Sequence, residues 1–143
     1  MSLTFEQMAQ AHKRWDEMDE RLKKLIGFNP ATSNHYGSIQ LYNHQISMQT
    51  SEEEILKLRA DYLKWREGVL NILEENGYVP DEKEFNDLFS ISGMFGTLYF
   101  LGVPVDIYCD IDETYRQRIL VYLTRKGIIT KNNIKGECMN GKD

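Results

Sequence analysis

Two long segments of this chain place apolar side chains at alternating spacings of three and four residues. In the first segment these residues are Met8, Ala11, Trp15, Met18, Leu22 and Leu25. In the second segment they are Ile55, Leu58, Tyr62, Trp65, Val69 and Ile72. This spacing gathers each set on one side of an α-helix of about six turns. The pattern therefore predicts two long amphipathic helices, at about 4–26 and 52–76.

Signals for helix ends frame both segments. Thr4 and Ser51 each stand three residues before a Gln or Glu, the spacing of a capping box. Gly27 and Gly77 follow the segments, as is typical of helix C-termini. Because the two helices have similar lengths and similar stripes, we expect them to pack antiparallel. An intermolecular coiled coil through the first helix is the alternative, although the stripe is short for one.

The second helix carries another apolar stripe beside the first one. Its members are Leu56, Leu63 and Leu70. An apolar arc this wide predicts that the helix lies centrally and contacts two neighbours.

The rest of the chain divides into shorter elements. Asp81 with Glu84 predicts a short helix, and Asp110 with Glu113 predicts a helix at 111–126. Residues 88–105 carry no charge and contain glycine and proline, which favours a buried core segment over a membrane span. Whether part of that segment is helix or strand stays open.

Residues 36–49 fit two patterns. Apolar residues alternate as in a small hairpin, but they also fit a helical face, and we favour a short helix. The predicted fold is mainly α, a single domain at 1–136 with a flexible tail at 137–143. A strand pair at 38–48, or a strand at 128–130, would make it α+β instead.

Length and composition limit the class of protein. A chain of 143 residues suits one domain. The N-terminus has no apolar region typical of a signal peptide, and the two cysteines lack a CxxC motif. We therefore expect reduced thiols, a cytoplasmic location and no membrane association.

The net charge of −5 is unevenly distributed. Residues 52–87 carry eleven acids and five bases, whereas residues 114–136 carry six bases and no acid. Residues 30–51 carry no Asp, Glu, Lys or Arg. An acidic protein is not expected to coat DNA, although a local basic contact remains open.

No motif in the sequence indicates an enzyme. There is no GxSxG, GxxxxGK[ST] or GxGxxG pattern. His12, Asp16 and Glu20 share a helix face, but neighbouring lysines favour a solvated surface over a metal site. We therefore expect no catalytic residues, no metal site and no cofactor.

The uncharged segment is the main candidate for binding. It combines amides, tyrosine and histidine, a mixture common at protein interfaces. The first hypothesis is a non-enzymatic adaptor, inhibitor or immunity-type factor that binds another protein through this segment and an adjoining acidic face. Its candidate residues are Asn34, His35, Tyr36, Tyr42, Asn43, His44, Glu52, Glu53 and Glu54.

The basic segment supports a second hypothesis, a small nucleic-acid-binding regulator. A row of cations on one helix face can contact phosphates. The candidate residues are Arg116, Arg118, Arg125, Lys126, Lys131 and Lys135.

Overall fold

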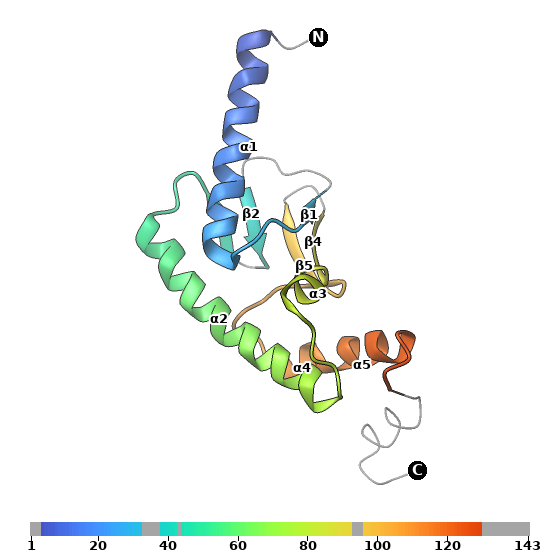
Figure 1. Ribbon diagram of the computed structural model, residues 1–143. Helices are drawn as coiled ribbons and strands as arrows, with labels where there is room; N and C mark the ends of the chain where they lie inside the picture. The colour runs from blue at the N-terminus through green and yellow to red at the C-terminus, as the bar shows by residue number, and fades with distance from the viewer. Residues whose placement is uncertain (1–3, 33–37, 43, 93–95, 130–143) are drawn as a thin grey trace.

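The computed structural model describes residues 4–32, 38–42, 44–92 and 96–129. The elements in chain order are α1 (Phe5–Ile26), β1 (Ala31–Thr32), β2 (Ser38–Leu41), β3 (His44–Ser47), α2 (Glu52–Glu75), α3 (Glu82–Asn86), β4 (Phe89–Ser92), β5 (Thr97–Phe100), β6 (Val103–Pro104), α4 (Ile111–Thr114) and α5 (Arg116–Arg125). Figure 1 shows α1 projecting from a body made of the sheet and the remaining helices.

The caps of the long helices are confirmed. Thr4 and Gln7 form a complete capping box at α1, and the Ser51 hydroxyl accepts from the backbone N–H of Glu54 at α2. Gly27 ends α1 with φ of 90°, a left-handed conformation that glycine adopts without steric cost. The short helix after Asp81 is also confirmed, with its own capping box to Glu84.

A mixed sheet joins segments that are far apart in the sequence. The strand order is β1-β4-β5-β2-β3, and β6 pairs with β5 beside this path. β4 and β5 form an antiparallel pair that sets Phe89 opposite Phe100 and Ile91 opposite Leu98. β2 is parallel to β5, in contact at Gln40 and Thr97. The uncharged 88–105 segment therefore supplies three of the six strands found in the described residues.

The favoured helix at 36–49 is wrong, and the hairpin alternative is right. Ile39 pairs with Ile46 and Leu41 with His44 across β2 and β3. A helix would have placed Tyr42 on the same buried face as Ile39 and Ile46. Instead Tyr42 is exposed, and along β2 the buried Ile39 and Leu41 alternate with half-buried residues, which is the two-residue period of a strand.

The prediction of a mainly α fold is therefore wrong, because the sheet makes the domain α+β. The antiparallel helix pair is also wrong. The side chain of Arg21 donates to the Thr50 carbonyl, and Arg59 donates to the Lys24 and Leu25 carbonyls at 3.1 Å. The C-terminal part of α1 thus lies against the N-terminal half of α2, and both helices run downward in Figure 1.

The second apolar stripe on α2 was predicted to pack against another element, and most of it does not. Leu56 and Leu63 are exposed and Leu70 is half-buried. The neighbours of α2 instead cover the side that carries Tyr62 and Trp65.

An aromatic cluster forms the centre of the core. The Trp65 ring stacks on Tyr62 and meets three more rings, two from the sheet and one from the residue between α4 and α5. These are Phe89, Phe100 and Tyr115, with ring centroids 5.3–6.1 Å away. One side chain of α2 therefore connects the helix to the sheet and to the C-terminal helices.

Within the described residues, no helix is long and apolar enough to cross a membrane.

The buried tyrosines predict a loss of stability at alkaline pH. Burial raises the pKa of Tyr62 and Tyr115 well above the ordinary value of 10, because it disfavours the phenolate. Below pH 10 both hydroxyls stay protonated in the folded and unfolded states. Above it the unfolded chain loses these protons first, so the free energy of unfolding should fall as the pH rises. Urea unfolding at neutral pH and at about pH 11 measures this. Equal stability at both pH values would contradict it.

Candidate functional site

The tip of the β2–β3 hairpin presents two of the predicted binding residues. Tyr42 begins the turn with φ of 52°, an uncommon conformation for a non-glycine residue, and its side chain is 59% exposed. His44 opens β3 and is half-buried. Two-residue hairpin turns favour positive φ, which explains why Tyr42 adopts it.

A second segment meets the hairpin at His44. The ring of Tyr108, from the connection between β6 and α4, contacts the His44 ring edge-on with centroids 5.2 Å apart. The Tyr108 hydroxyl donates a hydrogen bond to the Asp61 carboxylate on α2. Tyr108 is still 53% exposed. Three segments therefore hold one accessible aromatic ring in place, and we call Tyr42, His44, Asp61 and Tyr108 the aromatic site.

The polar groups of the aromatic site are fixed by one hydrogen bond between Tyr108 and Asp61. The hydrogen bond to Asp61 is the main reason why the pKa of Tyr108 is raised, so its hydroxyl stays protonated and acts as a donor. The carboxylate of Asp61 is engaged by that hydroxyl. The site offers flat aromatic area with a few fixed polar atoms, which is the chemistry of a protein contact surface.

Four of the nine predicted binding residues fall in gaps between the described ranges. Asn34, His35, Tyr36 and Asn43 lie outside the described residues.

The predicted acidic face is partly used within the molecule. Glu52 forms an ion pair of 2.6 Å with Lys24 of α1, and that hydrogen bond lowers the pKa of Glu52. Glu53 and Glu54 are exposed in the first turn of α2. One of the three predicted acids therefore joins two helices, and two face solvent.

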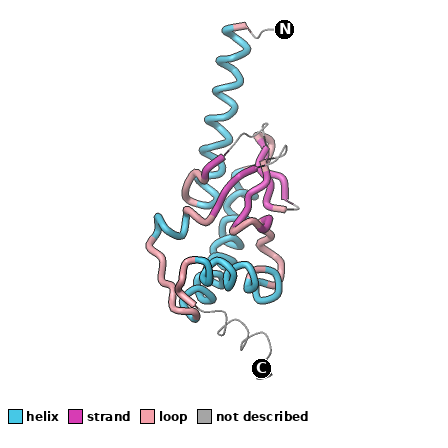
Figure 2. The backbone as a smooth tube through the Cα atoms, turned by 90° about the vertical axis from the view of Figure 1, so that its right-hand side faces the viewer, coloured by secondary structure: helices cyan, strands magenta, loops and turns pink. Residues whose placement is uncertain are grey.

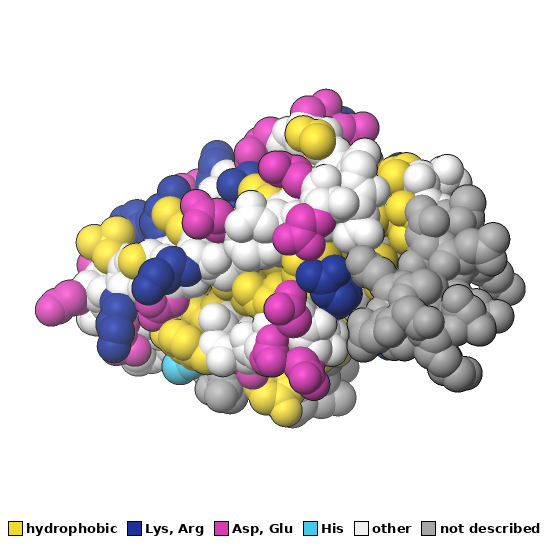
Figure 3. Space-filling view, turned by 90° about the horizontal axis from the view of Figure 1, so that it is seen from below, with side chains coloured by type: hydrophobic (Ala, Val, Ile, Leu, Met, Phe, Trp, Pro, Cys, Tyr) yellow, Lys and Arg dark blue, Asp and Glu magenta, His cyan; other side chains and the backbone are white. Residues whose placement is uncertain are grey.

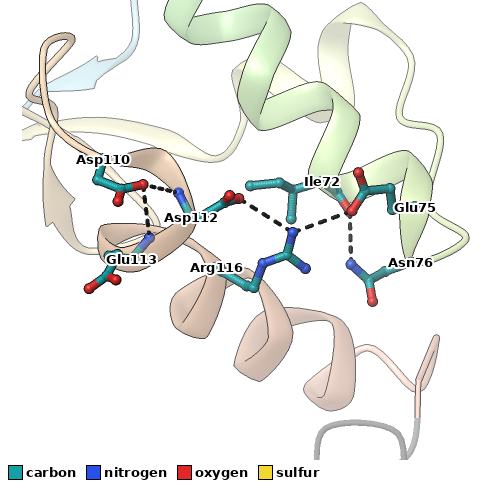
Figure 4. Close-up of polar contacts among 7 residues, drawn as sticks. All are labelled: Ile72, Glu75, Asn76, Asp110, Asp112, Glu113 and Arg116. Carbon is teal, nitrogen blue, oxygen red and sulfur yellow. Dashed lines mark hydrogen bonds and ion pairs between the residues drawn. The ribbon is translucent and has the colours of Figure 1, made fainter. Parts of the chain in front are cut away.

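The basic segment is also partly engaged. Arg116 lies between Glu75 and Asp112, with ion pairs of 3.3 and 3.4 Å (Figure 4). Lys126 lies over the rings of Tyr78 and Tyr122. Arg118 and Arg125 are exposed, and Lys131 and Lys135 lie outside the described residues.

The lower face of the molecule has mixed charge. On the face seen in Figure 3, Lys and Arg side chains are interspersed with Asp and Glu among the described residues. Within the basic segment, the pairing of Arg116 with Glu75 and Asp112 favours structural ion pairs over a phosphate-binding row.

A charged groove lies between α1 and the start of α2. Its volume is about 350 Å³, and its walls carry both signs of charge. Arg21 uses its guanidinium on the Thr50 carbonyl, and Lys24 is paired with Glu52. These internal bonds join the two helices, so the groove is better explained as a structural joint than as a ligand site. The residues lining it are Glu20, Arg21, Lys23, Lys24 and Glu52.

Sequence reasoning missed two members of the aromatic site. Asp61 was one acid on a charged helix face, and Tyr108 belonged to a short connection without a recognisable motif. They are 47 positions apart, so no local spacing could have linked them.

Comparison with protein-family models, curated proteins and solved structures finds no match for this chain. Within the described residues, no cluster of three or more His, Cys, Asp or Glu could hold a metal ion. The proposed function therefore rests on the residues and contacts of the chain itself.

Proposed function

We propose that this protein is a non-enzymatic adaptor, inhibitor or immunity-type factor that binds a protein partner through the aromatic site. The observation that carries the proposal is the fixed position of an exposed ring. Tyr108 is held by the Asp61 carboxylate and by the edge of His44, yet about half of its surface remains accessible.

Such an arrangement suits binding for an energetic reason. A side chain already fixed in the free protein loses little rotamer freedom when a partner covers it. Tyrosine adds a large contact area and a hydroxyl, and it is among the residues that dominate interface energies. Tyr42 places a second exposed ring two residues before His44 on the same hairpin. The exposed acids Glu53 and Glu54 would add steering toward a basic partner surface.

Replacing Tyr108 with alanine should weaken partner binding by roughly tenfold to thirtyfold, or about 1.4–2 kcal/mol. The test is capture of proteins from the native cells by wild-type chain and variant side by side, followed by titration of the captured partner. Binding should fall with Tyr108→Ala while circular dichroism stays unchanged.

Val79→Ala is the matched control, because Val79 is an exposed apolar residue outside the aromatic site. It should leave the affinity unchanged. If both variants bind the partner as tightly as wild type, the aromatic site is not the contact surface and the proposal fails.

A further inference from the structure

Helix α1 consists of two halves with different surroundings. In the C-terminal half, Met18, Leu22 and Leu25 are buried against α2 and the sheet. The N-terminal half extends beyond the body of the molecule in both perpendicular views (Figures 1 and 2). Its residues 5–10 and 12–16 are all exposed.

The apolar stripe of α1 continues into the half of the helix that projects from the body. It continues through Ala11 to Met8, with Phe5 at its side. Phe5 is 89% exposed, Met8 40% and Trp15 44%. Exposed apolar area at helical spacing is unfavourable in water, and a free helix of about 12 residues is marginally stable. The apolar stripe on the projecting half therefore indicates packing against another helix.

The arrangement of side chains fits a second copy of the same segment. In an antiparallel pair with its two-fold axis between residues 9 and 10, Met8 lies opposite the partner's Ala11, and Trp15 lies opposite the partner's Thr4. Two Met–Ala pairs then flank the axis. The small alanine lets the two backbones approach, as ridge-into-groove packing requires.

The flanks of the stripe are compatible with the same register. On one flank Arg14 meets the partner's Gln7, an uncharged acceptor. On the other flank Phe5 meets the partner's His12. Because side chains repeat every 3.6 residues, Glu6 and Lys13 point to the opposite face of the helix. The pairing therefore sets no like charges against each other.

The area available is consistent with a small, reversible interface. Aromatic side chains contribute on the order of 150–250 Å² each when covered. Phe5 is almost fully accessible, but less than half of Met8 and of Trp15 is, so the pair buries less than the ~1,200 Å² of standard stable interfaces and belongs to the class of weak, reversible contacts.

Charge argues against a membrane as the occupant. Helices that lie on membranes carry polar faces rich in Lys and Arg. Residues 5–16 contain two acids and two bases, so the segment has no net positive charge and no polar face rich in Lys and Arg. We propose that residues 5–16 of α1 form a two-fold antiparallel helix pair with the same segment of a second copy. This surface is separate from the aromatic site.

Two alanines on α1 provide a matched test. Ala11 lies within the stripe, whereas Ala9 is exposed on another face of the same turn. Sedimentation velocity of the full chain over a range of concentrations should show a monomer–dimer equilibrium for wild type and for Ala9→Glu. Ala11→Glu should raise the dimer dissociation constant at least tenfold. Circular dichroism then checks that both variants keep their helix content.

Cross-linking tests the register. In chains whose native Cys109 and Cys138 are replaced by serine, an equimolar mixture of Met8→Cys and Ala11→Cys should form intermolecular disulfides under mild oxidation. Either variant alone should not, because the antiparallel offset separates like positions beyond disulfide reach.

Three results would overturn the proposal. The first is a wild-type chain that stays monomeric at every concentration. The second is equal weakening by Ala9→Glu and Ala11→Glu. The third is a monomer that binds vesicles of phosphatidylcholine and phosphatidylserine in an Ala11-dependent manner, which would make this face a membrane-binding helix.

Discussion

Replacing Trp65 with alanine is expected to lower the free energy of unfolding by about 3–5 kcal/mol, the largest effect of a single substitution in this domain. Trp65 is buried, and its ring meets those of Phe89, Phe100 and Tyr115. Alanine leaves a cavity where α2, the sheet and α5 meet, and rigid aromatic neighbours cannot fill it by relaxing. Urea unfolding followed by circular dichroism measures the loss.

Leu63→Ala provides the control on the same helix. Leu63 lies two positions from Trp65 but is exposed, so its truncation should cost less than about 1 kcal/mol. If Trp65→Ala does not fold, Trp65→Phe keeps an aromatic ring and still creates a smaller cavity. Similar losses for Trp65→Phe and Leu63→Ala would show that the cluster is not the centre of the core.

The helices could be predicted because their signals are local. The caps at Thr4, Ser51, Asp81 and Asp110 lie within three residues of the backbone groups they satisfy. Each capping residue therefore indicates the start of a helix from the local sequence alone.

The sheet could not be predicted in the same way, because its pairings are long-range. Ala31 pairs with Ser90, and Gln40 pairs with Thr97. Strands of two to four residues are too short to show a period of their own. For the hairpin, both periods fitted the apolar residues, and pairing of β2 with β5 favours the strand.

The helix arrangement failed for a related reason. Antiparallel packing assumes a simple connection between two helices of similar length. Here β1, β2 and β3 lie between α1 and α2, so the chain has already turned back when α2 begins. This leaves the first half of α1 outside the body of the domain and the Leu56–Leu63 stripe exposed.

The candidate site was predicted in part. The composition of the uncharged segment drew attention to Tyr42 and His44, and both lie at the exposed hairpin tip. Composition does not reveal which remote side chain supports them. The contribution of Asp61 depends on how α2 packs beside the connection that carries Tyr108, which is a tertiary contact.

Tyr115→Phe is expected to lower the free energy of unfolding by about 1–3 kcal/mol, although it removes a single oxygen. The buried Tyr115 hydroxyl accepts from the Asp106 backbone N–H at 2.8 Å and donates to the Pro104 carbonyl at 3.0 Å. Phenylalanine fills the same space but leaves both backbone groups without this partner. Urea unfolding of the variant at neutral pH measures the cost.

Tyr62→Phe separates the hydrogen bonds from the ring. Tyr62 is equally buried, but its hydroxyl has no partner of hydrogen-bond geometry among the described residues. Removing that hydroxyl should therefore be neutral or slightly stabilising. Equal losses for the two variants would mean that the bonds to Asp106 and Pro104 add nothing. A loss confined to Tyr115→Phe would show that these bonds hold the β6–α4 connection, the segment that positions Tyr108 for a partner.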